Sequence, residues 1–496
     1  MLAASAREVV ASLRARPFIL AACGIAALVL LPRLVDLGSV LTVDEPLWQA
    51  RAHQFVEAIA TGQIRKTAIT GQPGITAMWI AGLAVPWNSL AISQAAIATA
   101  VTIVSLANIV LLRRLAGTAV AVAAGVLMAL DPFFIAHSRV VHTDALLASF
   151  MLLTLLCLLC AWHTRERRYV AYAGIAAALT GLTKLFGLFV LLPAALTILF
   201  APRAHAASSS VLWKGTLRRF GVFALPFIIT FLLLWPVLLV SPRTPLAFIT
   251  QRVTLHAQEA AVGSGGGDTW YYPREFARRL SLGVSVLFGA ALSMSEQKSD
   301  RYMLIAHLAT DIASGAALVW IAHLLAGNNA RQRVLLTAVL VGSAGGLMAR
   351  DLLQLHPYTM GHWNRLLPIP ANAKLGWGEG LDQAAAYLRS LNRPASELTT
   401  ASYYPGVLAH FLPGVRVERF TQYESADYRF VVLYRSMYGR DRGSYETAAL
   451  QQFLGADPQE GMIREVDGAR FRLEKIVWVD RLPFVWVFQR LPKTPT

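Results

Sequence analysis

Two adjacent carboxylates, Asp44 and Glu45, lie in the stretch SVLTVDEPLWQARAHQF, a few residues after an apolar run that resembles a membrane span. A charge placed near lipid is costly, so an acidic pair at this point needs a reason. A carboxylate that is partly desolvated at a membrane surface binds its proton more tightly and becomes a better general base. The pair therefore indicates acid–base chemistry at the edge of a bilayer.

A structural role explains one of these two acids. The run TVDE has the Thr-x-x-Glu spacing of a capping box, with Thr42 as N-cap and Glu45 at the third helical position. Acidic residues in a first turn also suit the helix dipole. Because the capping box does not need Asp44, a structural and a catalytic role both remain open for that residue.

A second polar cluster follows in the run HSRVVHTDA, which contains His137, Arg139, His142 and Asp144. Asp144 could orient an acceptor or hold a cation, with Arg139 and His142 beside it as substrate contacts. Alternatively, Thr143 and Asp144 begin the next helix, and Arg139 pairs with Asp144.

Three cations could bind a phosphate. Lys184 is the only charged residue between Tyr169 and Pro202, and it lies where two apolar runs meet. A lone lysine in such a place either binds an anion or extends its amine to the interface. Lys298 and Arg301 could bind the same phosphate through charge-assisted hydrogen bonds, or could anchor the chain at a membrane boundary.

A metal ion and an aromatic contact are weaker possibilities. His142 and Asp144 could ligate a divalent ion, with His256 or Glu259 as a further ligand, but dispersed ligands of this kind do not identify a cofactor. Tyr272 could contact a sugar or a lipid, or could be an interface anchor.

The elements that must position these residues are membrane helices. The chain has 496 residues, a mean hydropathy of +0.49, 55% hydrophobic residues and only 15% charged residues. A soluble domain of this composition would be unusual. Apolar runs recur along the first 355 residues and predict spans at 18–35, 91–112, 118–137, 144–162, 170–183, 185–201, 220–240, 303–326 and 334–353.

The net charge of +16 does not indicate nucleic-acid binding, because the basic residues lie mainly in short loops between the predicted spans. This is the positive-inside pattern, in which anionic lipid is the partner. It predicts a multi-pass plasma-membrane protein whose N-terminus is cytoplasmic. The loop 36–90 and the C-terminus then lie outside, and 281–295 is expected to be a re-entrant or interfacial helix.

The predicted fold class is mainly α: a transmembrane domain over residues 1–355, followed by a small soluble α/β domain over 376–496. Polar residues, proline, glycine and tyrosine increase after about residue 355. The run EGLDQAAAYLRSL predicts a helix and YRFVVLYRS a strand. The run IREVDGARFRLEKIVWV predicts a hairpin around Asp467 and Gly468.

Several stretches, in order, resemble the C-type membrane glycosyltransferases, in the branch that contains the protein O-mannosyltransferases and the lipid A aminoarabinose transferase. The resemblance covers nearly the whole chain. Besides the first acidic stretch and its loop, it rests on LDPFFIAHSRVVHTDALLASF, LTGLTKLFGLFVLLPAAL, WYYPREFARRLS, KSDRYML, and LHPYTMGHW followed by GWGEGLDQAAAYL.

The resemblance implies an enzyme that moves a sugar from a polyprenyl-phosphate donor to an acceptor hydroxyl. It implies that Asp44 is catalytic with Glu45 beside it, and that Asp144 is the acid of the second loop. Lys184, with the pair Lys298 and Arg301, would bind the donor phosphate.

The chemistry of such a donor needs few groups. Phosphate is already a competent leaving group, so one base for the hydroxyl and cations for the phosphate suffice. We expect Asp44 to be that base and the single displacement to invert the anomeric carbon. The acceptor is left open as a protein, a lipid or a growing glycan.

Two other classes of function compete with this one. A transporter or flippase of lipid-linked sugars should place charges deep within spans and show two similar halves with broken helices. The sequence shows no such halves. A scaffold or receptor would give Asp44, Asp144 and Lys184 no reason to converge.

Overall fold

The computed structural model describes residues 20, 23–200, 209–262, 303–363, 375–420, 428–439, 445–455 and 457–492. They form two compact units. The first comprises the described residues up to Leu37 and those from Leu47 to Arg350. The second comprises Gly38–Pro46 and the described residues from Asp351 onward. The segment that contains Asp44 thus belongs to the same unit as the C-terminal sheet.

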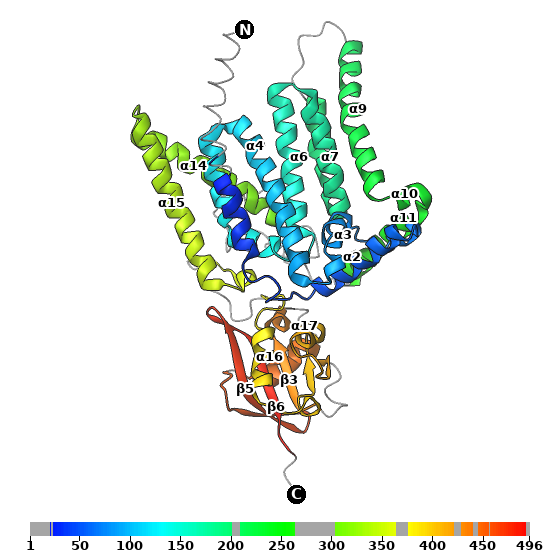
Figure 1. Cartoon of the computed structure of the whole chain (residues 1–496), viewed down its shortest axis with the longest axis vertical. Coiled ribbons are helices and arrows are strands. Elements are labelled where there is room, and N and C mark those ends of the chain that lie inside the picture. The colour runs from blue at the N-terminus through cyan, green and yellow to red at the C-terminus, as the bar shows by residue number, and fades with distance from the viewer. Residues whose placement is uncertain are drawn as a thin grey trace. The chain divides into compact units, whose positions relative to one another are not determined.

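The first unit is helical (Figure 1). Its first described helix is Cys23–Leu34. The helices that follow are α2 (Glu45–Ala60), η1 (Ile64–Thr67), α3 (Ile75–Gly82), η2 (Val85–Trp87), α4 (Leu90–Leu130), α5 (Pro132–Ser138), α6 (Asp144–Thr164), α7 (Arg167–Thr183), η3 (Leu185–Val190), α8 (Leu191–Phe200), α9 (Ser209–Leu234), α10 (Val237–Val240), α11 (Arg243–Val262), α14 (Leu304–Ala326) and α15 (Ala330–Leu355).

Five helices among the described residues are long and apolar enough to cross a membrane. They are Leu90–Leu130, Asp144–Thr164, Lys214–Leu234, Leu304–Ala326 and Ala330–Leu355, and Leu185–Phe200 is a shorter apolar helix. The prediction of a multi-pass membrane protein is therefore confirmed.

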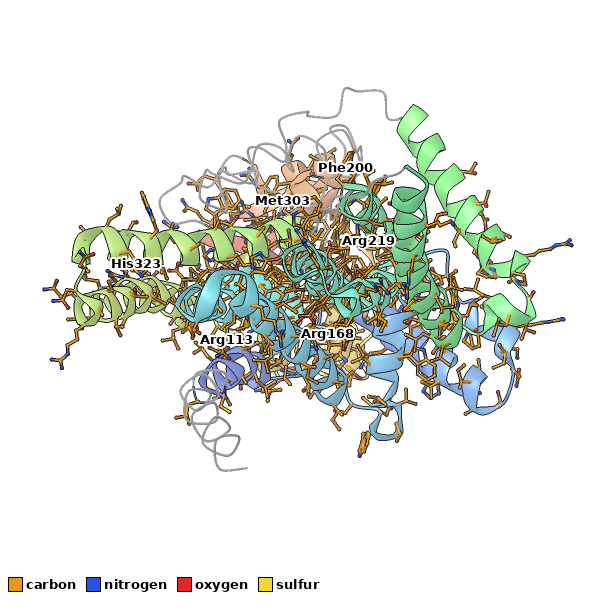
Figure 2. All side chains as sticks on the ribbon, turned by 90° about the horizontal axis from the view of Figure 1, so that it is seen from above. Arg113, Arg168, Phe200, Arg219, Met303 and His323 are labelled. Atoms are coloured by element: carbon orange, nitrogen blue, oxygen red, sulfur yellow. The ribbon has the colours of Figure 1, made fainter. Side chains whose placement is uncertain are left out.

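Helix α6 is the centre of this unit. Within its most apolar stretch 72% of the residues are buried inside the protein, against 6% in α9 and 11% in α15. Neighbours of α6 include α4, α7, α8 and α14. The outer helices keep large apolar side chains exposed, such as Leu233 and Leu353, as lipid-facing helices do. Figure 2 shows side chains projecting from the outer helices.

The predicted span 118–137 is wrong at its end. Gly117 has a non-helical backbone (φ 84°, ψ 171°) and separates the two halves of α4, as the two predicted spans require. The second half, however, ends at Leu130. Asp131 accepts hydrogen bonds from the amides of Phe133 and Phe134 and begins the short helix α5, with Pro132 in its first turn. A capping acid followed by proline ends one helix and starts another, although the apolar run continues.

The second unit contains a six-stranded sheet in the order β2-β1-β3-β6-β5-β4. Strands β1 (Thr400–Ser402), β2 (Val417–Arg419) and β3 (Phe430–Tyr434) are parallel, whereas β6 (Leu482–Arg490) runs antiparallel to β3 and to β5. The other elements are η5 (Thr359–Gly361), α16 (Leu381–Ser390), η6 (Ala395–Glu397), α17 (Pro405–Phe411), η8 (Arg435–Gly439), α18 (Tyr445–Leu454), β4 (Ile463–Val466) and β5 (Ala469–Val479).

The predicted helix, strand and hairpin of this unit are confirmed as α16, β3 and the pair β4–β5. Asp467 and Gly468 form the turn with φ of 50° and 72°, as a two-residue hairpin of this type requires. Strand β6 is not among the predicted elements, although it lies at the middle of the sheet and its residues Phe484 to Phe488 are buried. The expected re-entrant helix 281–295 lies outside the described residues.

Candidate active site

Asp144 and Lys184 form a buried ion pair in the helical unit. Lys184 Nζ donates to Asp144 Oδ1 over 2.8 Å, and the side chains are 15% exposed for Lys184 and 2% for Asp144. Asp144 lies in the first turn of α6, where the helix dipole favours a negative charge. Lys184 ends α7 in an extended conformation (φ −160°, ψ 137°), just before η3. The break between α7 and η3 at Lys184 places the Lys184 amine at the N-terminus of α6.

His142 extends this pair. Its Nδ1 lies 3.0 Å from Asp144 Oδ2, within ion-pair distance but without the angles of a hydrogen bond. The ring is buried and meets Trp48 edge-to-face, with centroids 5.9 Å apart. Asp144 therefore lies between an amine and an imidazole.

The loop 36–90 contributes its helices to this region. Trp48, on α2, contacts His142. On α3, the Thr76 hydroxyl lies 2.7 Å from that of Thr183, the residue before Lys184. Trp79, also on α3, donates to the carbonyl of Leu234 over 2.9 Å. These contacts fix α2 and α3 against the ends of α6, α7 and α9.

A buried polar network lies behind the loop 139–143. Arg33 donates to Ser138 Oγ over 2.5 Å and to the carbonyls of Val29 and Ala129. Asp131 lies 3.2 Å from His307 Nδ1. Each of these charged groups has a polar neighbour, as burial demands. The network holds α5, and with it the loop that leads to Asp144.

Arg139 is placed by the backbone of the preceding loop. Its Nη2 donates to the carbonyl of Val35 over 2.5 Å and to that of Asp36 over 3.4 Å. These hydrogen bonds fix the backbone of Val35 and Asp36, the residues just before the segment 38–46.

Asp44 and Glu45 lie in the second unit. Glu45 is fully buried, and its Oε2 accepts a hydrogen bond from the Thr42 amide over 2.7 Å. This hydrogen bond is one half of the predicted capping box. The other half is wrong, because the Thr42 hydroxyl has no hydrogen-bond partner among the described residues and α2 begins at Glu45, so Thr42 is not the N-cap and Glu45 is not the third helical residue. Asp44 directly precedes the helix and is half-buried.

The run GWGEG, residues 376–380, supports this acidic segment. The Val43 amide donates to the Trp377 carbonyl over 3.0 Å. Gly378 has φ of +129°, and a Cβ there would lie 2.4 Å from the carbonyl oxygen of Leu41. Only glycine fits so close an approach of two backbones. Sequence reasoning assigns this run no role, and three glycines in five residues are the signal that could have revealed it.

Tyr434 anchors GWGEG from the sheet. Its hydroxyl accepts from the Gly378 amide and donates to Glu379 Oε2, each over 2.9 Å. Complete burial first, and then the charge of Glu379, raise the pKa of the Tyr434 hydroxyl well above its usual range. The hydroxyl therefore stays protonated and keeps donating.

The remaining predicted residues are not placed. Tyr272, Lys298 and Arg301 lie outside the described residues. His256 and Glu259 lie on α11, but their side chains are not described. Within the described ranges, no group of three or more His, Cys, Asp or Glu side chains could hold a metal ion.

A buried acid–lysine pair at the end of membrane helices, under a loop of short helices, fits the predicted class, and a family comparison supports it. Residues 82–237 match the model of a family described as dolichyl-phosphate-mannose-protein mannosyltransferase. The match covers less than half of the chain but includes both Asp144 and Lys184. Over these residues the chain is similar to a family of lipid-linked-sugar transferases, which supports the resemblance to the C-type membrane glycosyltransferases. No curated protein matches the sequence.

Solved structures give more distant similarities. The crystal structure of ArnT from Cupriavidus metallidurans in the apo state is 14% identical, with a TM-score of 0.45, over 96% of this chain and 98% of that one. ArnT bound to undecaprenyl phosphate is 15% identical, with a TM-score of 0.41, over 93% and 97%. The oligosaccharyltransferase AglB from Archaeoglobus fulgidus, in complex with an inhibitory peptide and a dolichol-phosphate, is 13% identical, with a TM-score of 0.42, over 84% and 68%.

Proposed function

We propose that this protein transfers a sugar from a polyprenyl-phosphate donor to an acceptor hydroxyl at the outer face of the plasma membrane. The observation that carries the proposal is the Lys184–Asp144 pair, 2.8 Å long and nearly closed to solvent. A buried amine held at the end of apolar helices is suited to an anion that arrives in lipid.

In the proposed reaction Asp44 takes the proton of the acceptor hydroxyl. The oxygen attacks the anomeric carbon, and the bond from that carbon to the phosphate oxygen breaks. The electron pair leaves with the phosphate, whose charge Lys184 stabilises. One displacement with one base inverts the anomeric centre.

The other groups have supporting roles in this proposal. Asp144 holds the Lys184 amine, and His142 and Arg139 shape the second-loop side of the substrate site. Glu45 fixes the first turn beside Asp44. Lys298 and Arg301 would share the phosphate, and Tyr272 would contact the sugar or the lipid. The acceptor is a protein, a lipid or a glycan.

We also propose that the N-terminus is cytoplasmic and the C-terminal unit extracytoplasmic. The distribution of arginines along α6 supports this orientation. Asp144 begins α6, whereas Arg165, Arg167 and Arg168 follow its other end. A helix of this length spans about 30 Å, the thickness of the hydrocarbon core. Arginines at the far end mark the cytoplasmic side.

The test is release of carrier phosphate by the purified full chain from a panel of polyprenyl-phosphate sugars. Asp44→Asn should lower the release rate by at least about 100-fold, the usual contribution of a general base. Glu57→Gln, which changes an exposed acid on α2, the helix that follows Asp44, is the control and should leave the rate unchanged. Equal release by the wild type and Asp44→Asn would remove Asp44 from its role. Donor movement across the membrane without phosphate release would favour a transporter.

A further inference from the structure

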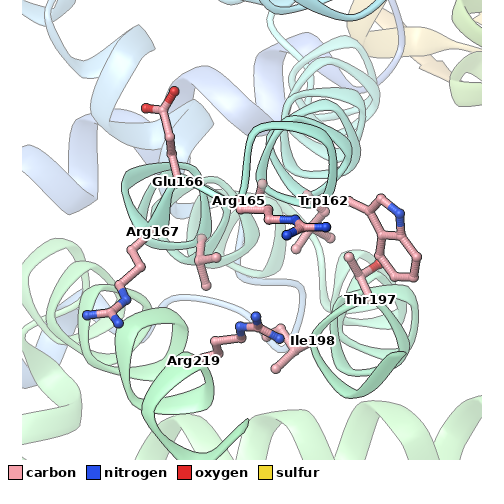
Figure 3. A pocket seen from close by; sticks show the side chains of 10 residues that line it. Trp162, Arg165, Glu166, Arg167, Thr197, Ile198 and Arg219 are labelled. Atoms are coloured by element: carbon pink, nitrogen blue, oxygen red, sulfur yellow. The ribbon is translucent and has the colours of Figure 1, made fainter. Parts of the chain in front are cut away.

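A pocket lies at the opposite end of α6 and α7 from Asp144 and Lys184 (Figure 3). It forms where α6 ends and α7 begins, against α8 and α9. The space between its lining residues has a volume of about 450 Å³, part of which is open to the surroundings. Figure 2 looks onto this end of the helices.

The pocket is cationic. Arg165 caps the C-terminus of α6 in the left-handed conformation (φ 59°), Arg167 begins α7, and Arg219 enters from α9. Figure 3 shows the guanidinium groups of Arg165 and Arg219 directed into the same space. Within the described residues, no carboxylate pairs with any of these three arginines.

The one acid of the lining does not neutralise this charge. Glu166 is directed away from the pocket (Figure 3), and its Oε2 pairs with Arg168 Nε over 2.5 Å. Glu166 and Arg168 therefore satisfy each other. Figure 3 shows Arg167 directed outward, so that Arg165 and Arg219 are the two arginines that face the pocket.

The rest of the lining is apolar. Trp162 is 39% exposed beside Arg165, as an indole at a membrane interface commonly is. Val170 and Ile198 form deeper parts of the lining. On the neighbouring turns Leu159 and Phe200 are 53% and 69% exposed, a surface suited to acyl chains. Cations thus lie above an apolar surface that continues down the helices.

We propose that this pocket binds an anionic phospholipid, with its phosphate between Arg165 and Arg219 and its chains along α6 and α8. Arginine pairs hold phosphate oxygens by charge-assisted hydrogen bonds, and lipid chains cover apolar helix surface without cost. The site lies one membrane thickness from Asp144 and is independent of the catalytic proposal. The bound lipid would hold α6, α7 and α9 together at this end, which is the proposed cytoplasmic side.

Native mass spectrometry of the full chain in a neutral detergent tests this proposal, with phosphatidylglycerol as the probe and phosphatidylcholine as the zwitterionic comparison. The wild type should retain phosphatidylglycerol preferentially. The double variant Arg165→Gln/Arg219→Gln should bind it about 30-fold more weakly, since each arginine near an anionic headgroup contributes a factor of about five. Arg168→Gln, at the same end but paired with Glu166, should bind it as the wild type does.

Two controls distinguish lipid binding from a folding defect and from the binding of any small anion. The variants should unfold at the same temperature as the wild type in detergent without added lipid, which shows that they fold. Inorganic phosphate at the same concentration should leave the lipid bound, because it cannot contact Trp162 and Ile198. Equal retention of phosphatidylglycerol by the double variant and Arg168→Gln, or its displacement by inorganic phosphate, would overturn the proposal.

Discussion

At the scale of single residues, the pair Asp144–Lys184 is costly to bury. Removing two charges from water costs several kcal/mol per ion, and only a close, well-aligned partner offsets that cost. Replacing such pairs by apolar residues is often neutral or stabilising, so a retained pair is weak evidence for a role in stability. The cost is reasonable if the amine serves a substrate that brings its own negative charge.

Stability and activity should therefore respond differently to changes in this pair. Lys184→Met and Asp144→Asn each remove one partner, and Lys184→Met leaves a buried carboxylate uncompensated, which should cost about 3–5 kcal/mol. The double variant should recover most of that stability. Carrier-phosphate release should be lost in Lys184→Met and in the double variant, because both lack the cation. Thermal unfolding in detergent and the release assay measure the two effects.

The double variant and Lys184→Met give the decisive comparison. A double variant that is as unstable as the sum of both single changes would mean that the pair does not couple. A stable and fully active double variant would remove Lys184 from phosphate binding.

The sequence is informative about isolated charges and uninformative about their partners. Lys184 and Asp144 stand out because charges are rare in apolar runs, and the structure brings them together. Arg139 is a plausible partner for Asp144 in the sequence, whereas the structure shows it donating to the carbonyls of Val35 and Asp36. Backbone carbonyls leave no mark in a sequence, so such a partner could not be predicted.

At the scale of elements, the run GWGEG acts as a support for the segment before α2. Its backbone at Trp377 accepts from Val43, and Gly378 lies directly under Leu41. Tyr434 and Glu379 then hold the run from the sheet side. The proposed base, Asp44, follows Val43 directly, so the precision of the segment determines where its carboxylate lies.

Gly378→Ala should therefore lower kcat by more than a loss of folded protein can explain. The new Cβ would lie 2.4 Å from a backbone oxygen, so the segment 41–44 must move. A displacement of about 1 Å in a reacting group can cost on the order of 100-fold in rate. Steady-state release of carrier phosphate measures kcat and KM. We expect kcat to fall at least roughly tenfold, with a smaller change in the KM for the lipid donor.

Gly414→Ala is the matched control for this substitution. Gly414 also has a positive φ, +82°, but a Cβ there meets nothing within 4 Å. It should destabilise the unit through backbone strain alone and leave kcat unchanged. If both variants lose activity to the same extent, general destabilisation explains the loss, and GWGEG has no positioning role.

Hydropathy locates the membrane elements well and their ends less well. The predicted spans that correspond to α6, α7, α14 and α15 agree with the structure within a few residues, because a long apolar run has few alternatives to a helix. The predicted span 118–137 runs past the helix end at Leu130 because the mean hydropathy of a long window is little changed by one acidic residue, Asp131. Strand β6 escapes prediction because its turn, Asp480 and Arg481, lacks the glycine that marks the β4–β5 turn, and because Pro483 near its start weakens the strand signal.

At the scale of the whole molecule, the two compact units do not follow the order of the sequence. The segment Gly38–Pro46 is grouped with the C-terminal sheet, although it comes from between two helices of the first unit. Composition alone divides the chain near residue 355 and cannot detect such an exchange. The consequence is that the C-terminal unit should be required for catalysis through the segment 38–46 that it holds.

A chain that ends after Leu355 tests this consequence. It keeps the helical unit with Asp144 and Lys184 but loses Trp377, Gly378 and the sheet that supports them. The truncated protein should remain in the membrane after alkaline carbonate extraction, because its apolar helices are intact. Release of carrier phosphate should nevertheless fall at least as far as in Gly378→Ala, since the segment 38–46 has lost its packing partners. Full activity in the truncated chain would show that this segment positions Asp44 without the C-terminal unit.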